Sequence, residues 1–194
     1  GELAYYDLLN PAIQTITTLF QEHGTARYGV EPVTQLEHAL QSASLAEDEG
    51  ASVWMVTAAL LHDIGHIFED GLLQPFDANV SLNDHHEHRA NTWLTEHFGP
   101  QVADPSRLRG RAKRYLCSID ETYLPQLSPT SRKSYHDQGG RMSEEELVVF
   151  ERETFYRDAL ELRQWDDRAK DPLMKTPPLE HFLTVIDKVA LCAV

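Results

Sequence analysis

The chain has 194 residues, 41% of them hydrophobic and 9% aromatic, which is the size and composition of one globular domain rather than of a disordered chain. The 17 Lys and Arg stand against 31 Asp and Glu, so the formal net charge is −14. A surface this acidic repels nucleic-acid phosphates. It excludes a broad nucleic-acid interface and leaves room only for a few converging cations that bind one small anion.

The cysteines and the apolar runs indicate a soluble, cytoplasmic protein. Cys117 and Cys192 lack the CxxC spacing of a metal or redox site, so we expect two reduced, buried thiols. No apolar run reaches the roughly 18 residues of a membrane span. The N-terminus also lacks the basic-then-apolar layout of a secretory signal. We therefore expect no membrane partner, while the sequence indicates no particular oligomeric state.

Apolar residues recur with helical spacing along most of the chain. Ile13, Ile16 and Phe20 share one side of the first predicted helix, and Ser52 is a predicted N-cap. The helices are predicted at about 5–23, from about 33, from 52 to before 65, and at about 84–97, 106–119, 143–163 and 178–192.

Between these helices, two Gly/Pro breaks make 68–83 a predicted mobile loop, and the segment 127–140 is polar. No segment shows strand alternation, and there is no repeat. The predicted fold is therefore an all-α helical bundle in a single domain, 1–194.

The strongest local signal is His62 followed directly by Asp63, within the segment 60–66. Two adjacent side chains cannot face one way on an ideal helix, but at a helix end they can converge on one cation. Imidazole and carboxylate together suit divalent iron, manganese or zinc. The carboxylate can also bridge two metals, and Gly65 permits a close backbone approach.

Further candidate ligands are distributed along the chain. His38 lies one predicted helix upstream, His86 lies downstream, and Asp166 follows much later. The order His … His-Asp … His … Asp resembles that of the HD superfamily of metal-dependent proteins. The alternative is that these are unrelated surface residues. The resemblance makes 1–194 a single HD-type domain with its motif-bearing core at about 28–166.

Several segments give a narrower resemblance. The Ala-Lys-Arg-Tyr-Leu segment at 112–116 and the Trp-Asp pair at 165–166 are the most discriminating, together with 28–31, 35–38, 58–66, 127–133 and 138–140. These segments resemble the 2-amino-1-hydroxyethylphosphonate dioxygenase family. That family consists of HD-fold mixed-valent diiron oxygenases that use dioxygen to cleave carbon–phosphorus bonds. Related enzymes act on 1-hydroxy-2-(trimethylammonio)ethylphosphonate and form glycine betaine.

Carried over residue by residue, the resemblance implies two iron ions in each chain. His38, His62, Asp63 and Asp166 would hold the first iron, with Asp63 bridging to the second. His86 would be a ligand of the second iron.

The resemblance also implies an organophosphonate site. Lys113, Ser131, Arg163 and His66 would bind the phosphonate, with Ser134 as a helper. On the residues alone, Lys113 would usually lie on a solvated helix face, and Ser131 could equally be a helix N-cap.

Two residues of the loop before His38 complete the implied site. Tyr28 would be a lid residue that occupies an iron position until the substrate displaces it. Glu31 would hold the cationic nitrogen of the substrate, an assignment that Coulomb attraction in a closed pocket supports. Without the resemblance, Glu31 would be taken for a solvated loop carboxylate.

One position departs from the family pattern. The family has an iron-ligating histidine four residues before the pocket lysine, whereas this chain has Arg109 there. A guanidinium has no lone pair to offer a metal. The second iron would then bind weakly, another histidine such as His85 or His88 would replace the ligand, or Arg109 would itself bind the substrate anion. We favour the first outcome.

The predicted function is oxidative cleavage of the C–P bond of a 1-hydroxy-2-amino- or 1-hydroxy-2-(trimethylammonio)ethylphosphonate. The products would be phosphate and glycine or glycine betaine. Two alternatives remain open. The chain could be an HD-type metal-dependent phosphohydrolase, or a catalytically impaired phosphonate-binding homologue, for which Arg109 is the best support.

Overall fold

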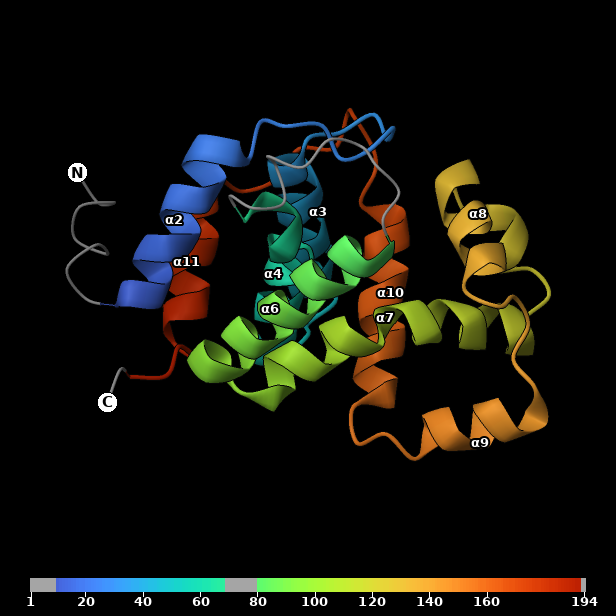
Figure 1. Cartoon of the computed structure of the whole chain (residues 1–194). Coiled ribbons are helices and arrows are strands. Elements are labelled where there is room, and N and C mark those ends of the chain that lie inside the picture. Colours follow the sequence, from blue (N-terminus) through green and yellow to red (C-terminus); the bar gives the residue numbers. More distant parts are fainter. Residues whose placement is uncertain (1–9, 69–79, 193–194) are drawn as a thin grey trace.

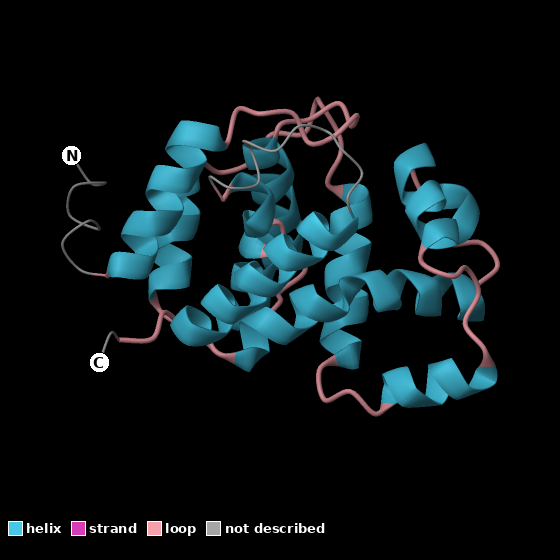
Figure 2. Cartoon of the chain, in the orientation of Figure 1, coloured by secondary structure: helices cyan, strands magenta, loops and turns pink. Residues whose placement is uncertain are grey.

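The computed structural model describes residues 10–68 and 80–192, with side chains in the second range from residue 87 onward. This part of the chain forms α-helices and short 3-10 helices and contains no β-strand (Figure 2), which confirms the all-α prediction. The α-helices are α2 (Pro11–His23), α3 (Gln35–Asp48), α4 (Val53–Leu61), α6 (Val80–Phe98), α7 (Pro100–Ile119), α8 (Pro129–Asp137), α9 (Glu144–Glu151), α10 (Tyr156–Arg168) and α11 (Leu179–Asp187); the 3-10 helices are η1 (Ile64–Ile67) and η2 (Leu124–Gln126).

Capping side chains determine where the helices begin. Thr34 and Glu37 form a capping box at the start of α3, each side chain bonding to the backbone of the other residue. Ser52 accepts from the backbone N–H of Met55 and begins α4, as predicted. The start of α3 at Gln35 fixes the register in which His38 faces inward.

The predicted helix at 143–163 is wrong, because the chain breaks into α9 and α10 with a turn at residues 152–155. Figure 1 shows α9 running across the direction of α10. The turn lets Phe150 of α9 pack on Tyr115 of α7, with ring centroids 5.1 Å apart. Burial of this aromatic pair favours the break over the helical propensity of the segment.

Other predicted boundaries also move. The α7 helix begins at Pro100 rather than 106 and continues through Pro105, whose ring is buried. The α6 helix begins at Val80, so 80–83 are helical rather than part of the predicted loop, and 69–79 lie outside the described residues. Residues 1–9 also lie outside them, and α2 begins at Pro11 after an Asn10 cap.

The buried apolar side chains form two clusters. The larger cluster joins α2, α3, α4, η1, α6 and α11 with one part of α7 and of α10. The smaller cluster joins the remaining parts of α7 and α10 to α9. In Figure 1, α2 and α11 lie side by side at one end, whereas α8 and α9 lie at the other. Both α7 and α10 therefore span the two clusters, and α3 and α4 pack against α10.

The cysteines fit the prediction only in part. Both are free thiols, but Cys117 is half-buried and Cys192 is exposed just beyond α11. The prediction that both are buried is therefore wrong. Within the described ranges, none of the helices has the length and apolarity needed to cross a bilayer.

Candidate metal centre and anion pocket

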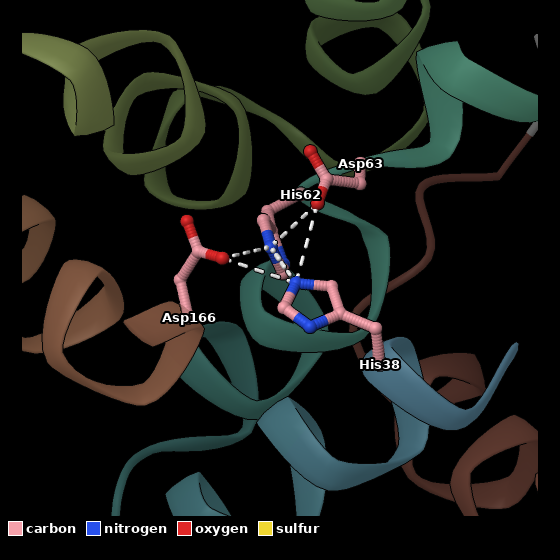
Figure 3. Close-up of side chains that lie close together, drawn as sticks. All are labelled: His38, His62, Asp63 and Asp166. Atoms are coloured by element: carbon pink, nitrogen blue, oxygen red, sulfur yellow. Dashed lines mark hydrogen bonds and ion pairs between the residues drawn. The ribbon is translucent and has the colours of Figure 1, made fainter. Parts of the chain in front are cut away.

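Four buried side chains converge where α3, α4 and α10 meet. His38 comes from α3, His62 and Asp63 follow the last residue of α4, and Asp166 comes from α10. Figure 3 shows the four side chains pointing toward one another, and their potential ligand atoms all lie within 4.8 Å. Because α4 ends at Leu61, the adjacent His62 and Asp63 reach one point, as the sequence predicts for a helix end.

The distances are those of ligands around one small cation. His38 Nε2 lies 3.1 Å from His62 Nε2 and 3.0 Å from Asp166 Oδ1. Asp63 Oδ2 lies 3.3 Å from His38 Nε2 and 3.1 Å from His62 Nε2. Two nitrogens and two carboxylate oxygens thus surround a common centre.

Backbone hydrogen bonds orient both imidazoles. The Nδ1 of His38 is 2.7 Å from the carbonyl oxygen of Ala169, and the Nδ1 of His62 is 2.7 Å from that of Ala59. A carbonyl accepts only, so each Nδ1 carries a proton, and the Nε2 of each ring faces the centre, where its lone pair can bind a proton or a metal ion. Two lone pairs this close repel unless a cation lies between them.

The charge of the centre also calls for a cation. Burial opposes a charged imidazole, but Asp63 and Asp166 outweigh burial and raise the pKa of His62 to about 9. Asp63 Oδ2 is buried and has no hydrogen-bond partner among the described residues, which costs free energy unless a cation binds it. This set of two imidazoles and two carboxylates fits a divalent transition metal, with iron among the suitable ions.

The second oxygen of Asp63 faces a different environment. Arg109, from α7, donates from Nη1 to Asp63 Oδ1, and His66 Nε2 lies 3.6 Å from the same oxygen. A second metal bridged by Asp63 would need the oxygen that this guanidinium contacts. The side chain of His86, the predicted ligand of that metal, lies outside the described residues, and His88 is exposed on α6.

The loop that follows α2 brings Tyr28 over the centre. Its ring stacks on His38 with centroids 3.9 Å apart and planes 13° apart. Burial raises the pKa of the Tyr28 hydroxyl well above its usual range, and the carboxylates of Asp63 and Asp166 raise it further. Gly29, with φ of +58°, allows the tight turn that closes with a hydrogen bond from the Glu31 N–H to the Tyr28 carbonyl.

Predicted anion-binding residues meet beside the metal centre. Lys113 is 2% exposed, and its ammonium donates to Ser134 Oγ. The Nη2 of Arg163 lies 3.4 Å from Ser131 Oγ, and its Nη1 lies 3.3 Å from Asp166 Oδ2. The solvated-face interpretation of Lys113 is therefore wrong.

The N-cap interpretation of Ser131 is also wrong, because Ser128 caps α8 and accepts from the Ser131 N–H. The Ser131 hydroxyl instead faces the cations of the pocket. Burial, together with the positive charge of Arg163, lowers the pKa of Lys113 to about 8. We call Lys113, Ser131, Ser134 and Arg163 the anion pocket.

Sequence reasoning missed two residues next to the anion pocket. Asp167 binds Arg163 through a 2.5 Å contact with Nη2 and accepts from the Tyr123 hydroxyl at 2.5 Å. Its spacing of four residues from Arg163 was an available signal for this pair. Lys170 donates to Ser131 Oγ at 3.1 Å. It follows α10 in a loop, where no periodic pattern marks it.

Known proteins resemble this chain in sequence. Residues 35–109 match the family model of the HD domain, so fold and centre together define an HD-domain protein. Hydroxymethylphosphonate dioxygenase of Gimesia maris is 42% identical over 90% of this chain and 87% of its own length. The glycine-betaine-forming [1-hydroxy-2-(trimethylamino)ethyl]phosphonate dioxygenase of Leisingera caerulea is 33% identical over 91% and 89%. An uncharacterized protein of Acanthamoeba polyphaga mimivirus is 31% identical over 88% and 78%. The chain belongs to the HD-domain phosphonate dioxygenase family.

Removing one ligand should weaken metal binding strongly. Changes to residues that only hydrogen-bond to metal ligands already cost about 10- to 100-fold in metal affinity. We therefore expect Asp166→Asn to weaken iron binding by at least about 100-fold. The adjacent Asp167→Asn serves as the matched control and should keep the metal. Titration calorimetry and elemental analysis measure both variants. Equal metal affinity in Asp166→Asn and the wild type would contradict the assigned centre.

Proposed function

We propose that the chain is an iron-dependent dioxygenase that cleaves the C–P bond of a 1-hydroxyalkylphosphonate to give phosphate and a carboxylate. The observation that supports this proposal most is that Arg163 connects the metal centre to the anion pocket. Its guanidinium contacts the metal-ligand carboxylate of Asp166 on one side and Ser131 of the anion pocket on the other. A phosphonate bound in that pocket would hold its C1 beside the metal centre.

Each side chain then has a defined task. Lys113 and Arg163 neutralise the phosphonate dianion, and Ser131 and Ser134 donate to its oxygens. Tyr28 covers the centre as a protonated phenol and moves aside when substrate enters. His66, whose side chain is 40% exposed beside Asp63, would contact the substrate next to the metal centre.

The atoms balance without an external reductant. One oxygen atom of dioxygen enters the carboxylate and the other enters phosphate. All the electrons that dioxygen accepts come from the substrate, whose C1 is oxidised as the C–P bond breaks. Bound iron would supply the one-electron chemistry that lets dioxygen react. The side chains contribute charge neutralisation and positioning.

The names of the relatives contain two kinds of substrate. One relative is named for hydroxymethylphosphonate and another for a trimethylamino-substituted 1-hydroxyethylphosphonate. The sequence-based prediction favours an amino or trimethylammonio substituent held by Glu31. Both classes share the 1-hydroxyphosphonate group that the anion pocket and the metal centre would bind.

Oxygen dependence tests the function directly. Iron-reconstituted protein should release phosphate from a 1-hydroxyphosphonate in air and should release none under argon. Phosphate release without oxygen would make the protein a hydrolase. Tight anaerobic binding with no product in air would make it a phosphonate-binding homologue. Either outcome removes the dioxygenase proposal.

The contact between Arg109 and Asp63 supports a proposal about the number of metal ions. The resemblance implies two irons in each chain, but this ion pair engages the oxygen that would bridge to the second, so we propose that only the first is held tightly. Arg109→His removes the guanidinium and offers an imidazole, and we expect it to increase the iron retained per chain after desalting. The matched control is Arg107→His, on the same helix but 41% exposed. Two tightly held irons in the wild type would contradict the expectation.

The lowered pKa of Lys113 predicts a pH dependence. Lys113 is charged below pH of about 8 and neutral above it, so kcat/KM should fall as the pH rises through this value. Lys113→Met should lower kcat/KM by about 10- to 100-fold, which is the contribution of one hydrogen bond to a charged group. It should also remove the fall of kcat/KM near this pH. Lys113→Arg should extend activity to higher pH. An unchanged step in Lys113→Met would assign the titration to another group.

A further inference from the structure

Lys170 lies between the anion pocket and Glu31. Its ammonium is 3.1 Å from Ser131 Oγ, 3.5 Å from Ser128 Oγ and 3.8 Å from Glu31 Oε1. The side chains of Lys170 and Glu31 are 12% and 13% exposed. This cation is therefore largely withdrawn from solvent, and it faces the carboxylate to which the resemblance assigns the cationic nitrogen of a substrate.

The backbone on both sides of Lys170 is anchored to α3. The carbonyl of Ala169 accepts from His38 Nδ1 at 2.7 Å. The carbonyl of Asp171 accepts from Gln41 Nε2 at 2.7 Å, and its N–H donates to Gln41 Oε1 at 3.1 Å. His38 and Gln41 are both 1% exposed. These buried bonds fix the direction from which the Lys170 side chain enters the pocket, so its position is built into the fold.

A second cation at this place would be unfavourable. A substrate ammonium directed at Glu31 would lie close to the Lys170 ammonium in a confined space, and like charges repel strongly where water is excluded. Lys170 already supplies Glu31 with a cationic partner. A substrate that ends at its hydroxymethyl carbon carries no ammonium group and therefore avoids this repulsion.

We propose that Lys170 is a specificity-determining residue: its ammonium, paired with Glu31, fills the cation end of the pocket and selects 1-hydroxyphosphonates that carry no ammonium group. This inference rests on the proposed function and narrows its substrate class to compounds of the size of hydroxymethylphosphonate. Glu31 then holds a side chain of the protein rather than the substrate.

Substitution of Lys170 tests the proposal through the ratio of the kcat/KM values for two substrates. In the wild type, kcat/KM should be higher for hydroxymethylphosphonate than for 2-amino-1-hydroxyethylphosphonate. Lys170→Met keeps the length of the side chain and removes its charge. We expect it to shift the ratio of the two kcat/KM values toward the amino compound by at least about tenfold, the effect of one modest interaction. Because both substrates are measured on one preparation, partial unfolding does not change the ratio.

Three further variants sharpen the test. Lys170→Arg keeps a cation and should keep the wild-type preference. Adding Glu31→Gln to Lys170→Met should remove the gain for the amino compound, because the freed carboxylate is what binds its ammonium. Lys133→Met, at a side chain 79% exposed on α8, is the charge-matched control and should leave the ratio unchanged.

The outcomes are distinguishable from failure of the proposed function. An equal loss for both substrates in Lys170→Met would overturn the inference, because Lys170 would then be one more phosphonate-binding cation. A wild-type preference for the amino compound would also overturn it. If no phosphonate is turned over, the proposed function fails. The inference can then still be tested by measuring the anaerobic dissociation constants of the two compounds and comparing their ratio in the wild type and in Lys170→Met. Absence of binding of either compound would overturn both.

Discussion

The site depends on the two hydrogen bonds that orient the imidazoles of His38 and His62. One is local, since His62 reaches back to the carbonyl of Ala59 at the end of α4. The other joins α3 to the segment that follows α10, through the carbonyl of Ala169. Together they turn two Nε2 lone pairs toward one point beside two carboxylates. The arrangement is unfavourable without a cation, so the fold itself creates the demand for one.

The buried cations around this centre are explained better by ligand binding than by stability. Removing two charges from water costs free energy that their attraction does not reliably return. Yet Arg109, Lys113 and Arg163 all lie largely or fully buried in a chain of net charge −14. Arg163 has the paired carboxylates of Asp166 and Asp167, whereas the ammonium of Lys113 donates only to the hydroxyl of Ser134 among the described residues. An incompletely neutralised lysine beside an arginine is what a dianionic ligand requires.

The sequence predicted what local patterns encode. His62 and Asp63 are adjacent, and a helix end is enough to make them converge. The resemblance then supplied His38 and Asp166, which no local pattern connects. Long-range packing decided the rest. The break after α9 follows from burial of Phe150 against α7, which the helical pattern of that segment conceals. The direction of Arg109 depends on how α7 crosses the end of α4, and the position of Lys170 depends on anchors more than a hundred residues earlier in the chain.

Arg109 and Lys170 occupy equivalent electrostatic positions, because each pairs with a buried or largely buried carboxylate. Each is a cationic side chain placed on a carboxylate oxygen that, by the family resemblance, would otherwise bind an external cation: Asp63 Oδ1 a second metal, and Glu31 a substrate ammonium. Under these proposals, positive charge would be kept near both carboxylates while its source changes from ligand to protein. The electrostatic field that a phosphonate meets would then stay attractive although the site would bind fewer external cations. Because both side chains occupy space as well as carry charge, each would also leave less room beside its carboxylate, and under the proposed function this would favour the smallest member of the substrate class.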